Sequence, residues 1–548
     1  MNIKVKINNH ELEIEKGITI EEILKKVKVN STYDVILAKV DGIYQDLSKK
    51  INKECDIKLY DLLDRGANES YLNGLVFLTI YAYKKVFGAY NNLVVKHSLD
   101  KGLYIEPSIK LTSEDVKKLE TAMREIVEQD LRIEKVTVSR LDAIDYFEKI
   151  NYKVKADLMK YNTSTHLTLY KLDNLFDYFY SLMPTRTGLL KHFELTYLDE
   201  DGFVLRFPTI YMKDGIKEFE IRNNIFNLHK ESRKWAKELE LENVVDLNKR
   251  VSSGNIDELI RIDEINKNNE LLNLAKTIIS NNEVKIVLLA GPSSTGKTTT
   301  TNKLTLCLKS LGKNPVMLSM DDYFVERDET PKNAKGEYDY ECLEAVDLKL
   351  FEEVVSKLLN KEEVTIPTYN FVLGKKEYNE KLKLDDNNIL LIEGIHALNP
   401  KVLESIDKSK KAKVYLSALN QLNVDDHVRI STTDNRLLRR ICRDNRTRGK
   451  NVEDTLASWC KVREGEEKYI FPYQDEADYT FNTAMIYELG VLKTYVEPLL
   501  YSVEPGTPYY NEAIRLLNFL RLFLPIPAEA IPADSIIREF IGGGCFRV

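Results

Sequence analysis

A run of small residues that ends in a lysine and a threonine carries the clearest chemistry in this sequence: Gly291-Pro292-Ser293-Ser294-Thr295-Gly296-Lys297-Thr298. It fits G-x-x-x-x-G-K-[ST] at every fixed position, and its glycines let backbone N–H groups turn inward on a phosphate without a side-chain clash. The lysine adds positive charge beside the outer phosphates, and the threonine hydroxyl can join a magnesium shell. We predict that this run, together with Thr299, binds the phosphates of ATP or GTP, with Mg²⁺ as cofactor.

Two apolar segments farther along the chain end in carboxylates. Asp321 follows the segment 315–320, and Glu393 follows the segment 388–392. Ligands bind at the carboxyl ends of strands in parallel sheets, so both acids are predicted to lie near the phosphate loop. Phosphoryl transfer uses one carboxylate to accept the proton of the acceptor hydroxyl and another to serve the metal. We assign the first role to Asp321 and the second to Glu393, with Thr298 as the other metal ligand; ordinary turn and strand-end acids are the alternative.

Six arginines crowd into one short segment: Arg436, Arg439, Arg440, Arg443, Arg446 and Arg448. Like charges at this density repel one another unless an anion joins them. We expect Arg443 and Arg448 to close over a polyphosphate as a lid and to neutralise charge on the transferred group. A solvated basic face or an RNA-contacting patch is the alternative.

The segments around these residues alternate between apolar strands and helices. We expect strands at 284–290, 315–320, 388–392, 412–418 and 479–482, and a helix at 298–311. Continuous apolar strands joined by helices are typical of a parallel sheet covered on both faces, so residues 283–500 are predicted to form an α/β domain. Residues 501–548 are expected to be a helical extension that closes this core, with a tight backbone approach at Gly542-Gly543-Gly544; no chemistry is assigned to it.

Different patterns precede this domain. Residues 1–62 contain apolar residues at every second position and a helix at 19–26, which is typical of a small α+β unit with a turn at Asp41-Gly42. Residues 63–222 are predicted to form a second α+β domain, and residues 223–282 a helical connector broken at Ser253-Gly254.

Bulk properties restrict the class of protein. A length of 548 residues implies about three or four folded units. The net charge of −7 and the pI of about 5.8 do not favour a dedicated nucleic-acid binder. The six cysteines form no C-x-x-C pair, no apolar run reaches 18 residues, and the first residues lack the apolar core of a secretory signal. We therefore expect a cytoplasmic protein with no membrane contact, and leave open whether it forms a homo-oligomer.

Six segments between Val284 and Thr483 resemble, in order and rough spacing, the uridine kinase and phosphoribulokinase family: LLAGPSSTGKTT, LSMDDYF, YDYECLEAVDLKLF, IPTYNF, LIEGIHAL and RLLRRICRDNRTRG. The resemblance implies a P-loop NTPase fold, with Asp321 as the base that activates a ribose 5′-hydroxyl and Glu393 as the magnesium-associated acid. It places Asp339 on the ribose hydroxyls and Tyr369 and Phe371 beside the nucleobase. Arg440, Arg443 and Arg448 would contact base and phosphates.

Two positions depart from the uridine-specific pattern. Gly374 stands where those kinases have a histidine at the pyrimidine edge, and Lys450 replaces an arginine. A lost edge contact removes hydrogen-bond discrimination, so the base is left open. The predicted reaction is transfer of the γ-phosphoryl group of ATP or GTP to the 5′-hydroxyl of a nucleoside. The alternatives are a kinase of the same fold acting on a sugar phosphate or an RNA end, and a nucleotide-gated tRNA-binding or regulatory protein.

The first 200 or so residues resemble another family. Residues 1–62 are similar to a ubiquitin-like TGS domain, and 63–222 to the second, editing domain of threonyl-tRNA synthetases. Asn73 and Phe77 fall where that family has a metal-binding histidine pair, and Pro184 and Gly188 fall near its cysteine and histidine. Asn and Phe cannot replace an imidazole on zinc. We expect this region to keep the shape without the editing chemistry, as a scaffold or regulatory module rather than a tRNA contact.

Overall fold

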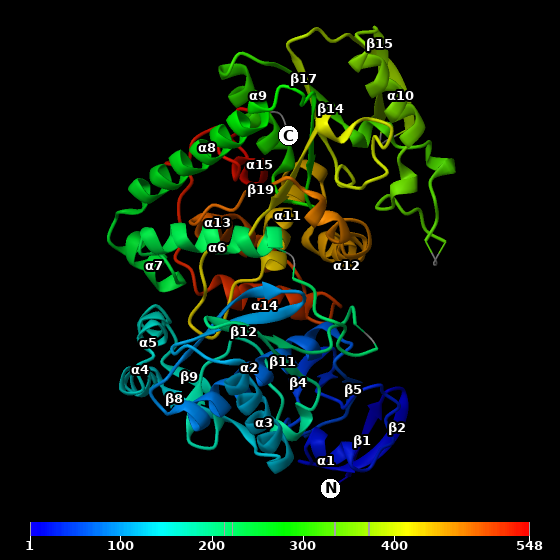
Figure 1. Cartoon of the computed structure of the whole chain (residues 1–548). Helices are drawn as coiled ribbons and strands as arrows, with labels where there is room; N and C mark the ends of the chain where they lie inside the picture. The colour runs from blue at the N-terminus through cyan, green and yellow to red at the C-terminus, as the bar shows by residue number, and fades with distance from the viewer. Residues whose placement is uncertain (1, 213, 222, 334–335, 371–372, 547–548) are drawn as a thin grey trace.

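The protein is described by a computed structural model that covers the whole chain except residues 1, 213, 222, 334–335, 371–372 and 547–548. The amino-terminal sheets, blue to cyan in Figure 1, occupy one end of the molecule, and a helix-covered sheet with residues from 284 onward occupies the other. Helix α14 (Tyr510–Leu520) lies between them and contacts strand β4 of the first sheet.

The first unit is a five-stranded mixed sheet with one short helix. Its strands stand in the order β2 (His10–Glu15), β1 (Asn2–Ile7), β5 (Cys55–Tyr60), β3 (Leu37–Val40) and β4 (Ile43–Asp46). Only the β1–β5 pair is parallel. Thr19 caps helix α1 (Ile20–Leu24) and exchanges hydrogen bonds with Glu22 in a capping box. The predicted turn lies between β3 and β4, where Asp41 and Gly42 both have positive φ.

The second unit is built around the long helix α2 (Arg65–Phe87), which is buried on most of its surface. One sheet contains β11 (Glu194–Asp199), β12 (Gly202–Arg206), β7 (Gly102–Pro107) and β6 (Leu93–Leu99), and another contains β10 (Leu175–Asp177), β9 (His166–Leu172) and β8 (Ile133–Ser139). Helices α3 (Ser113–Gln129), α4 (Arg140–Lys149) and α5 (Lys153–Lys160) complete it.

Apolar packing and amide hydrogen bonds occupy the positions aligned with metal ligands. The Asn73 amide donates to the Ser181 hydroxyl, and the Phe77 ring lies 5.6 Å from that of Phe179. Pro184 packs beside helix α2. The Gly188 amide donates to the Asp130 carboxylate at the end of α3. Within the described ranges, no three His, Cys, Asp or Glu side chains gather as a metal site would require.

Three helices span the predicted connector: α6 (Asn223–Glu238), α7 (Val244–Ser252) and α8 (Ile256–Ser280). The break between α7 and α8 falls at the expected Ser253-Gly254, where Gly254 has a positive φ. None of the described helices combines the length and apolarity needed to cross a bilayer.

The carboxyl-terminal sheet confirms the predicted α/β fold, with all five predicted strands present and parallel. Their order is β14 (Asn314–Ser319), β17 (Asn388–Glu393), β13 (Ile286–Ala290), β18 (Lys411–Ser417) and β19 (Tyr479–Asn482). Strand β13 alternates its side chains between a layer with α8 and α9 (Lys297–Ser310) and a layer with α10 (Leu348–Leu359). Since the strands that follow β13 in sequence lie on both sides of it, a ligand crevice is expected at its carboxyl end.

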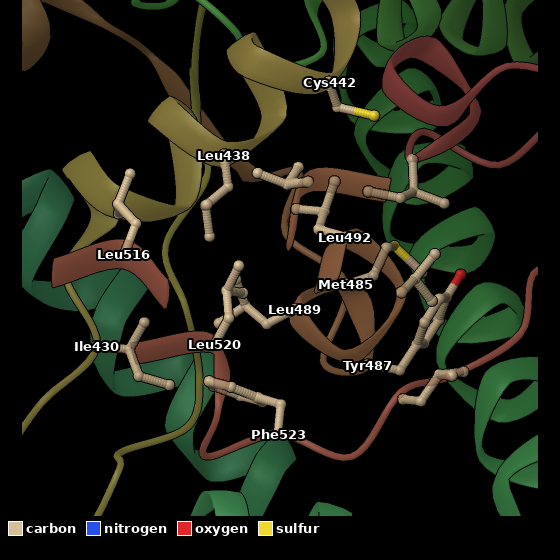
Figure 2. Packing of buried hydrophobic residues seen from close by; sticks show 14 of the residues in the cluster. Ile430, Leu438, Cys442, Met485, Tyr487, Leu489, Leu492, Leu516, Leu520 and Phe523 are labelled. Carbon is tan, nitrogen blue, oxygen red and sulfur yellow. The ribbon is translucent and has the colours of Figure 1, made fainter. Parts of the chain in front are cut away.

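Two additions flank this sheet. A hairpin of β15 (Val364–Asn370) and β16 (Lys375–Leu382) contains the aromatic motif, and a helical layer contains α11 (Thr432–Arg448), α12 (Val452–Tyr469), α13 (Glu488–Leu500), α14 and α15 (Arg538–Ile541). Figure 2 shows the core of this layer, where side chains of α11, α13 and α14 interdigitate. Burial of such apolar side chains stabilises this layer, and with it α11, the arginine helix, which contains the six clustered arginines.

The segment between β18 and α11 joins the two ends of the molecule. The Val95 amide of β6 donates to the Asp426 carbonyl over 2.8 Å, and the Asn423 amide side chain returns a bond to Val95. Lys155 and His427 share the buried carboxylate of Asp177. Burial alone would raise the pKa of Asp177, but these two neighbours bring it down to about 2. The segment is therefore fixed inside the amino-terminal half.

Candidate active site

The predicted phosphate loop connects β13 to α9 and curls back on itself. A side chain at Gly291 would lie 2.6 Å from the Leu416 carbonyl of β18, so only glycine fits there. Gly296 has φ +84°, which glycine adopts without strain, and Thr295 closes the turn by donating to the Pro292 carbonyl over 2.8 Å. The loop is therefore a tight turn that depends on glycine at both positions.

The Lys297 ammonium spans the mouth of this loop, donating to the Gly291 carbonyl over 3.0 Å and to the Pro292 carbonyl over 3.4 Å. The hydroxyls of Ser294 and Thr299 are buried and lack a hydrogen-bond partner among the described residues. Buried polar groups are normally satisfied, so an anion that accepts from these hydroxyls fits the loop. The helix amino terminus adds its positive end.

The two predicted carboxylates lie side by side because their strands are neighbours. Ser319 pairs with Glu393 in the β14–β17 register, and its hydroxyl donates to the Glu393 carboxylate over 3.1 Å. The same hydroxyl accepts from the Asp321 amide over 3.3 Å, which fixes a short 3₁₀ turn at Met320–Tyr323. One serine therefore positions both acids.

Enclosure by the protein raises the pKa of both Asp321 and Glu393, and the Lys297 charge opposes the rise in each. Solvent still reaches the Asp321 side chain, so we interpret this shift as the effect of a recess rather than of full burial. Arg448 also lies close enough to lower the pKa of Asp321. The structure thus brings Lys297, Asp321 and Glu393 near one another, and the roles assigned to them stay predictions.

The inner arginines of α11 are structural. Arg436 forms a buried ion pair with Glu466 of α12 and donates to the Ser293 carbonyl over 2.8 Å, and the same carboxylate accepts from the Ser293 amide. Arg439 pairs with buried Glu488 of α13 over 2.6 Å. These pairs hold the outside of the phosphate loop against the helical layer. Sequence reasoning missed both carboxylates, since nothing in their local pattern indicates a partner.

The outer arginines gather around one carboxylate. Buried Asp444 accepts from Arg443 over 2.9 Å and lies 3.2 Å from Arg440 and 3.6 Å from Arg448. The Asp444 carboxylate therefore relieves the repulsion between these arginines. A bound polyphosphate was expected in this role. Arg440 also donates to the Ser293 hydroxyl over 2.8 Å. Arg448 is the most exposed of these three arginines, with 51% of its side-chain surface accessible to solvent.

The proposed acceptor residues are less closely joined. The Tyr369 amide donates to Asp322 over 3.2 Å, and its ring packs edge-on against Phe324 at 5.7 Å. The Asp339 carboxylate accepts from the Glu341 amide over 3.1 Å, and no described contact joins Asp339 to Asp321. Phe371 lies outside the described residues.

Glu341 is a candidate that sequence reasoning missed. Burial, followed by repulsion from Glu466, raises its pKa to about 7, and Lys297 and Asp321 both influence it. Its only local signal was a second acid, Glu344, three residues farther along ECLEAV, which does not single out Glu341. At Gly374, an added side chain would come within 2.8 Å of Arg327, so the arginine covers the position that a histidine would fill.

Residues 286–486 match the phosphoribulokinase / uridine kinase family. This range contains the phosphate loop, both carboxylates and the arginines of α11. This region is a domain of that family. The kinase-family domain also has solved neighbours: a possible uridine kinase from Bacillus stearothermophilus, 18% identical over 39% of this chain and 98% of that one, with a TM-score of 0.25, and D-glycerate 3-kinase from Cryptococcus neoformans, 12% identical over 48% and 89%, with a TM-score of 0.20. The domain has the fold of a sugar or nucleoside kinase.

The part before the kinase-family domain has relatives of another kind. Threonine–tRNA ligase of Thermotoga sp. (strain RQ2) is 31% identical over 200 residues, and that of Thermotoga maritima is 30% identical over the same length. In both, the match covers 36% of this chain and 30% of the synthetase. The chain therefore spans less than a third of the length of these relatives.

Proposed function

We propose that the kinase-family domain transfers the γ-phosphoryl group of ATP, or GTP, to the 5′-hydroxyl of a nucleoside. The single observation that carries the proposal is that Lys297, at the mouth of the phosphate loop, lies close enough to the carboxylate of Asp321 for its charge to lower the pKa of that group. A kinase needs this pair, because the ammonium holds the donor while the carboxylate orients and deprotonates the acceptor.

The proposed division of labour is supported by the contacts at the loop and by the resemblance to the kinase family. Residues 291–299 bind the donor phosphates, and Arg443 and Arg448 neutralise charge that develops during transfer. Asp339, Tyr369, Phe371 and Arg440 are proposed to hold the acceptor. The raised pKa of Asp321 suits a base, since a carboxylate nearer neutrality takes up a proton more readily.

The residues at the loop fit a magnesium ion. Thr298 supplies a hydroxyl and Glu393 a carboxylate, the hard oxygen donors that Mg²⁺ prefers, and Glu393 stands on the strand next to β13. When bound, the ion neutralises charge on the phosphate oxygens. The remaining work, which is to orient the acceptor and to accept its proton, belongs to the protein.

An acceptor panel tests the proposal. The full chain would be incubated with labelled ATP and Mg²⁺ and with separate nucleosides, sugar phosphates and tRNA, beside the Asp321→Asn variant. We expect labelled nucleoside 5′-monophosphate that the variant does not make. Transfer only to a sugar phosphate or an RNA end would replace the nucleoside with that acceptor.

A second candidate is a nucleotide-dependent tRNA-binding or regulatory role for the amino-terminal half, favoured by its similarity to threonine–tRNA ligases. Binding of tRNA measured at several salt concentrations, with and without ATP, tests it. Affinity that falls steeply with salt and changes with ATP, in a protein with no acceptor turnover, would support this role over the kinase.

A further inference from the structure

The last described residues of the chain reach the phosphate loop. The Thr299 amide, in the first turn of α9, donates to the Glu539 carboxylate of α15 over 3.0 Å, although 240 residues separate them. A side chain at Gly296 would lie 2.7 Å from Ile536. Figure 1 shows α15, in red, beside α11 and close to the start of α9. A carboxylate of the protein itself therefore accepts the hydrogen bond of an amide in the first turn of the phosphate-binding helix.

This amide belongs to the set that a P-loop offers to a nucleotide. The first N–H groups of a helix lack intrahelical partners and bind anions, and in this motif they receive the donor phosphates. One N–H group has one hydrogen to donate. A phosphate and the Glu539 carboxylate cannot both take it, and their like charges repel.

Two neighbouring observations indicate that the carboxylate does not complete the site. The Thr299 hydroxyl is buried beside this contact and has no partner among the described residues. A side chain at Gly296 would also lie 3.9 Å from a Glu539 carboxylate oxygen, which places its negative charge against the loop that is proposed to receive phosphates. A phosphate accompanied by a cation would satisfy the hydroxyl and bring positive charge to the site, neither of which Glu539 does.

The backbone around Glu539 is anchored. Arg446 of α11 donates to the carbonyls of Glu539 and Phe540, over 2.8 and 3.1 Å. The Cys442 thiol lies against the Phe540 carbonyl, and Phe540 and Ile537 are fully buried in the core of the helical layer. Glu539 is itself buried at 4% exposure, so release of the Thr299 amide requires a change of its side-chain rotamer while the anchored backbone stays in place.

We propose that Glu539 is a built-in competitor for the donor at the Thr299 amide, and that it sets the affinity threshold for anions. Only a ligand that also engages Lys297, the loop amides and the metal would displace it, which favours a nucleoside triphosphate with Mg²⁺ over a monophosphate. The inference rests on the proposed function only in requiring that the loop bind a nucleotide. The acceptor plays no part in it.

Binding of a non-hydrolysable ATP analogue with Mg²⁺ tests the proposal, because calorimetry on the full chain needs no acceptor. If the amide is occupied about nine-tenths of the time, Glu539→Ala should lower the apparent Kd by about tenfold. Glu539→Gln keeps an acceptor but loses the charge, so its Kd should fall by a smaller factor. The matched control is Asp534→Asn, whose carboxylate belongs to the same segment but pairs with Lys303.

The outcomes separate clearly. Tighter binding in both Glu539 variants, with Asp534→Asn unchanged, supports competition. Unchanged or weaker binding in Glu539→Gln at an unchanged melting temperature would overturn it, and would make Glu539 a cap of α9 or part of the donor site. The Gln variant decides the matter even where Glu539→Ala fails to fold. A failed acceptor panel with tight analogue binding would count against the nucleoside assignment alone.

Discussion

The two ends of this molecule differ in whether the residues of the functional site are present. The amino-terminal half lacks the metal-binding residues of the family that it resembles, whereas the kinase-family domain has the residue types that its family uses. In the amino-terminal half, the positions aligned with metal ligands hold Asn73, which donates to a hydroxyl, and Phe77, whose ring packs at a tilt against Phe179. In the kinase-family domain, Lys297 and Asp321 fall at the positions that the resemblance predicts, and the ammonium lies close enough to lower the pKa of the carboxyl group. The difference teaches that a packed core and a functional site are separable, because the amino-terminal half folds around positions that hold no metal-binding side chains.

Lys297→Ala should have the largest effect on activity. Loss of the ammonium at the loop mouth is expected to lower turnover by roughly a thousandfold or more, since charge stabilisation dominates phosphoryl transfer. The comparison is sharpened by Asn73→Ala, which should leave turnover within about twofold because no described contact links Asn73 to the loop. Steady-state rates and melting temperatures of both variants check this. Equal losses of activity in the two would abolish the distinction between the halves.

Asp321→Asn should lower kcat by roughly a hundred- to ten-thousandfold, as expected for loss of a positioned base. Since burial raises the pKa of Asp321, wild-type kcat/KM should fall as the pH drops through that raised pKa, at higher pH than an ordinary aspartate would give. The residual activity of the variant should lack this acidic limb. A limb of unchanged position in the variant would assign it to another group.

Asp177→Ala tests whether the halves are one folding unit. The substitution leaves Lys155 and His427 buried without their shared carboxylate, so we expect a loss of about 3–5 kcal/mol in the free energy of unfolding. Denaturant unfolding followed by two probes, one in each half, measures it. Both transitions should move together, whereas a shift confined to the amino-terminal probe would show that the halves unfold separately. Exposed Asp142→Ala is a matched control for loss of a carboxylate.

Glu341→Gln should have the smallest effect, visible as a pH dependence of stability. The folded state holds a proton on Glu341 up to about pH 7, while the unfolded chain releases it near its ordinary value. Stability from this group therefore falls as the pH rises between those values. From pH 5 to pH 8 the wild type should lose roughly 2 kcal/mol more than the variant. Exposed Glu344→Gln should keep the wild-type slope.

The strands and the phosphate loop could be predicted because their signals are local. Continuous apolar runs gave all five parallel strands, and the helix expected at 298–311 occupies Lys297–Ser310. The partners of the arginines could not be predicted in this way, since Glu466 and Glu488 lie in other helices and nothing nearby marks them. The same holds for Glu539. The carboxyl-terminal extension that contains it was predicted to pack on the core, but no contact with the phosphate loop was predicted.

The segment between β18 and α11 connects the two halves of the molecule over a short stretch of chain. Its Asp426 carbonyl is tied to β6, and only a few residues later Ser431 begins the arginine helix by accepting from the Asp434 amide. Since few residues separate these two anchors, β6 and the start of α11 are held at a nearly fixed spacing. Arg440 of α11 donates to the Ser293 hydroxyl, so one short stretch of backbone connects a strand of the amino-terminal half to the phosphate loop.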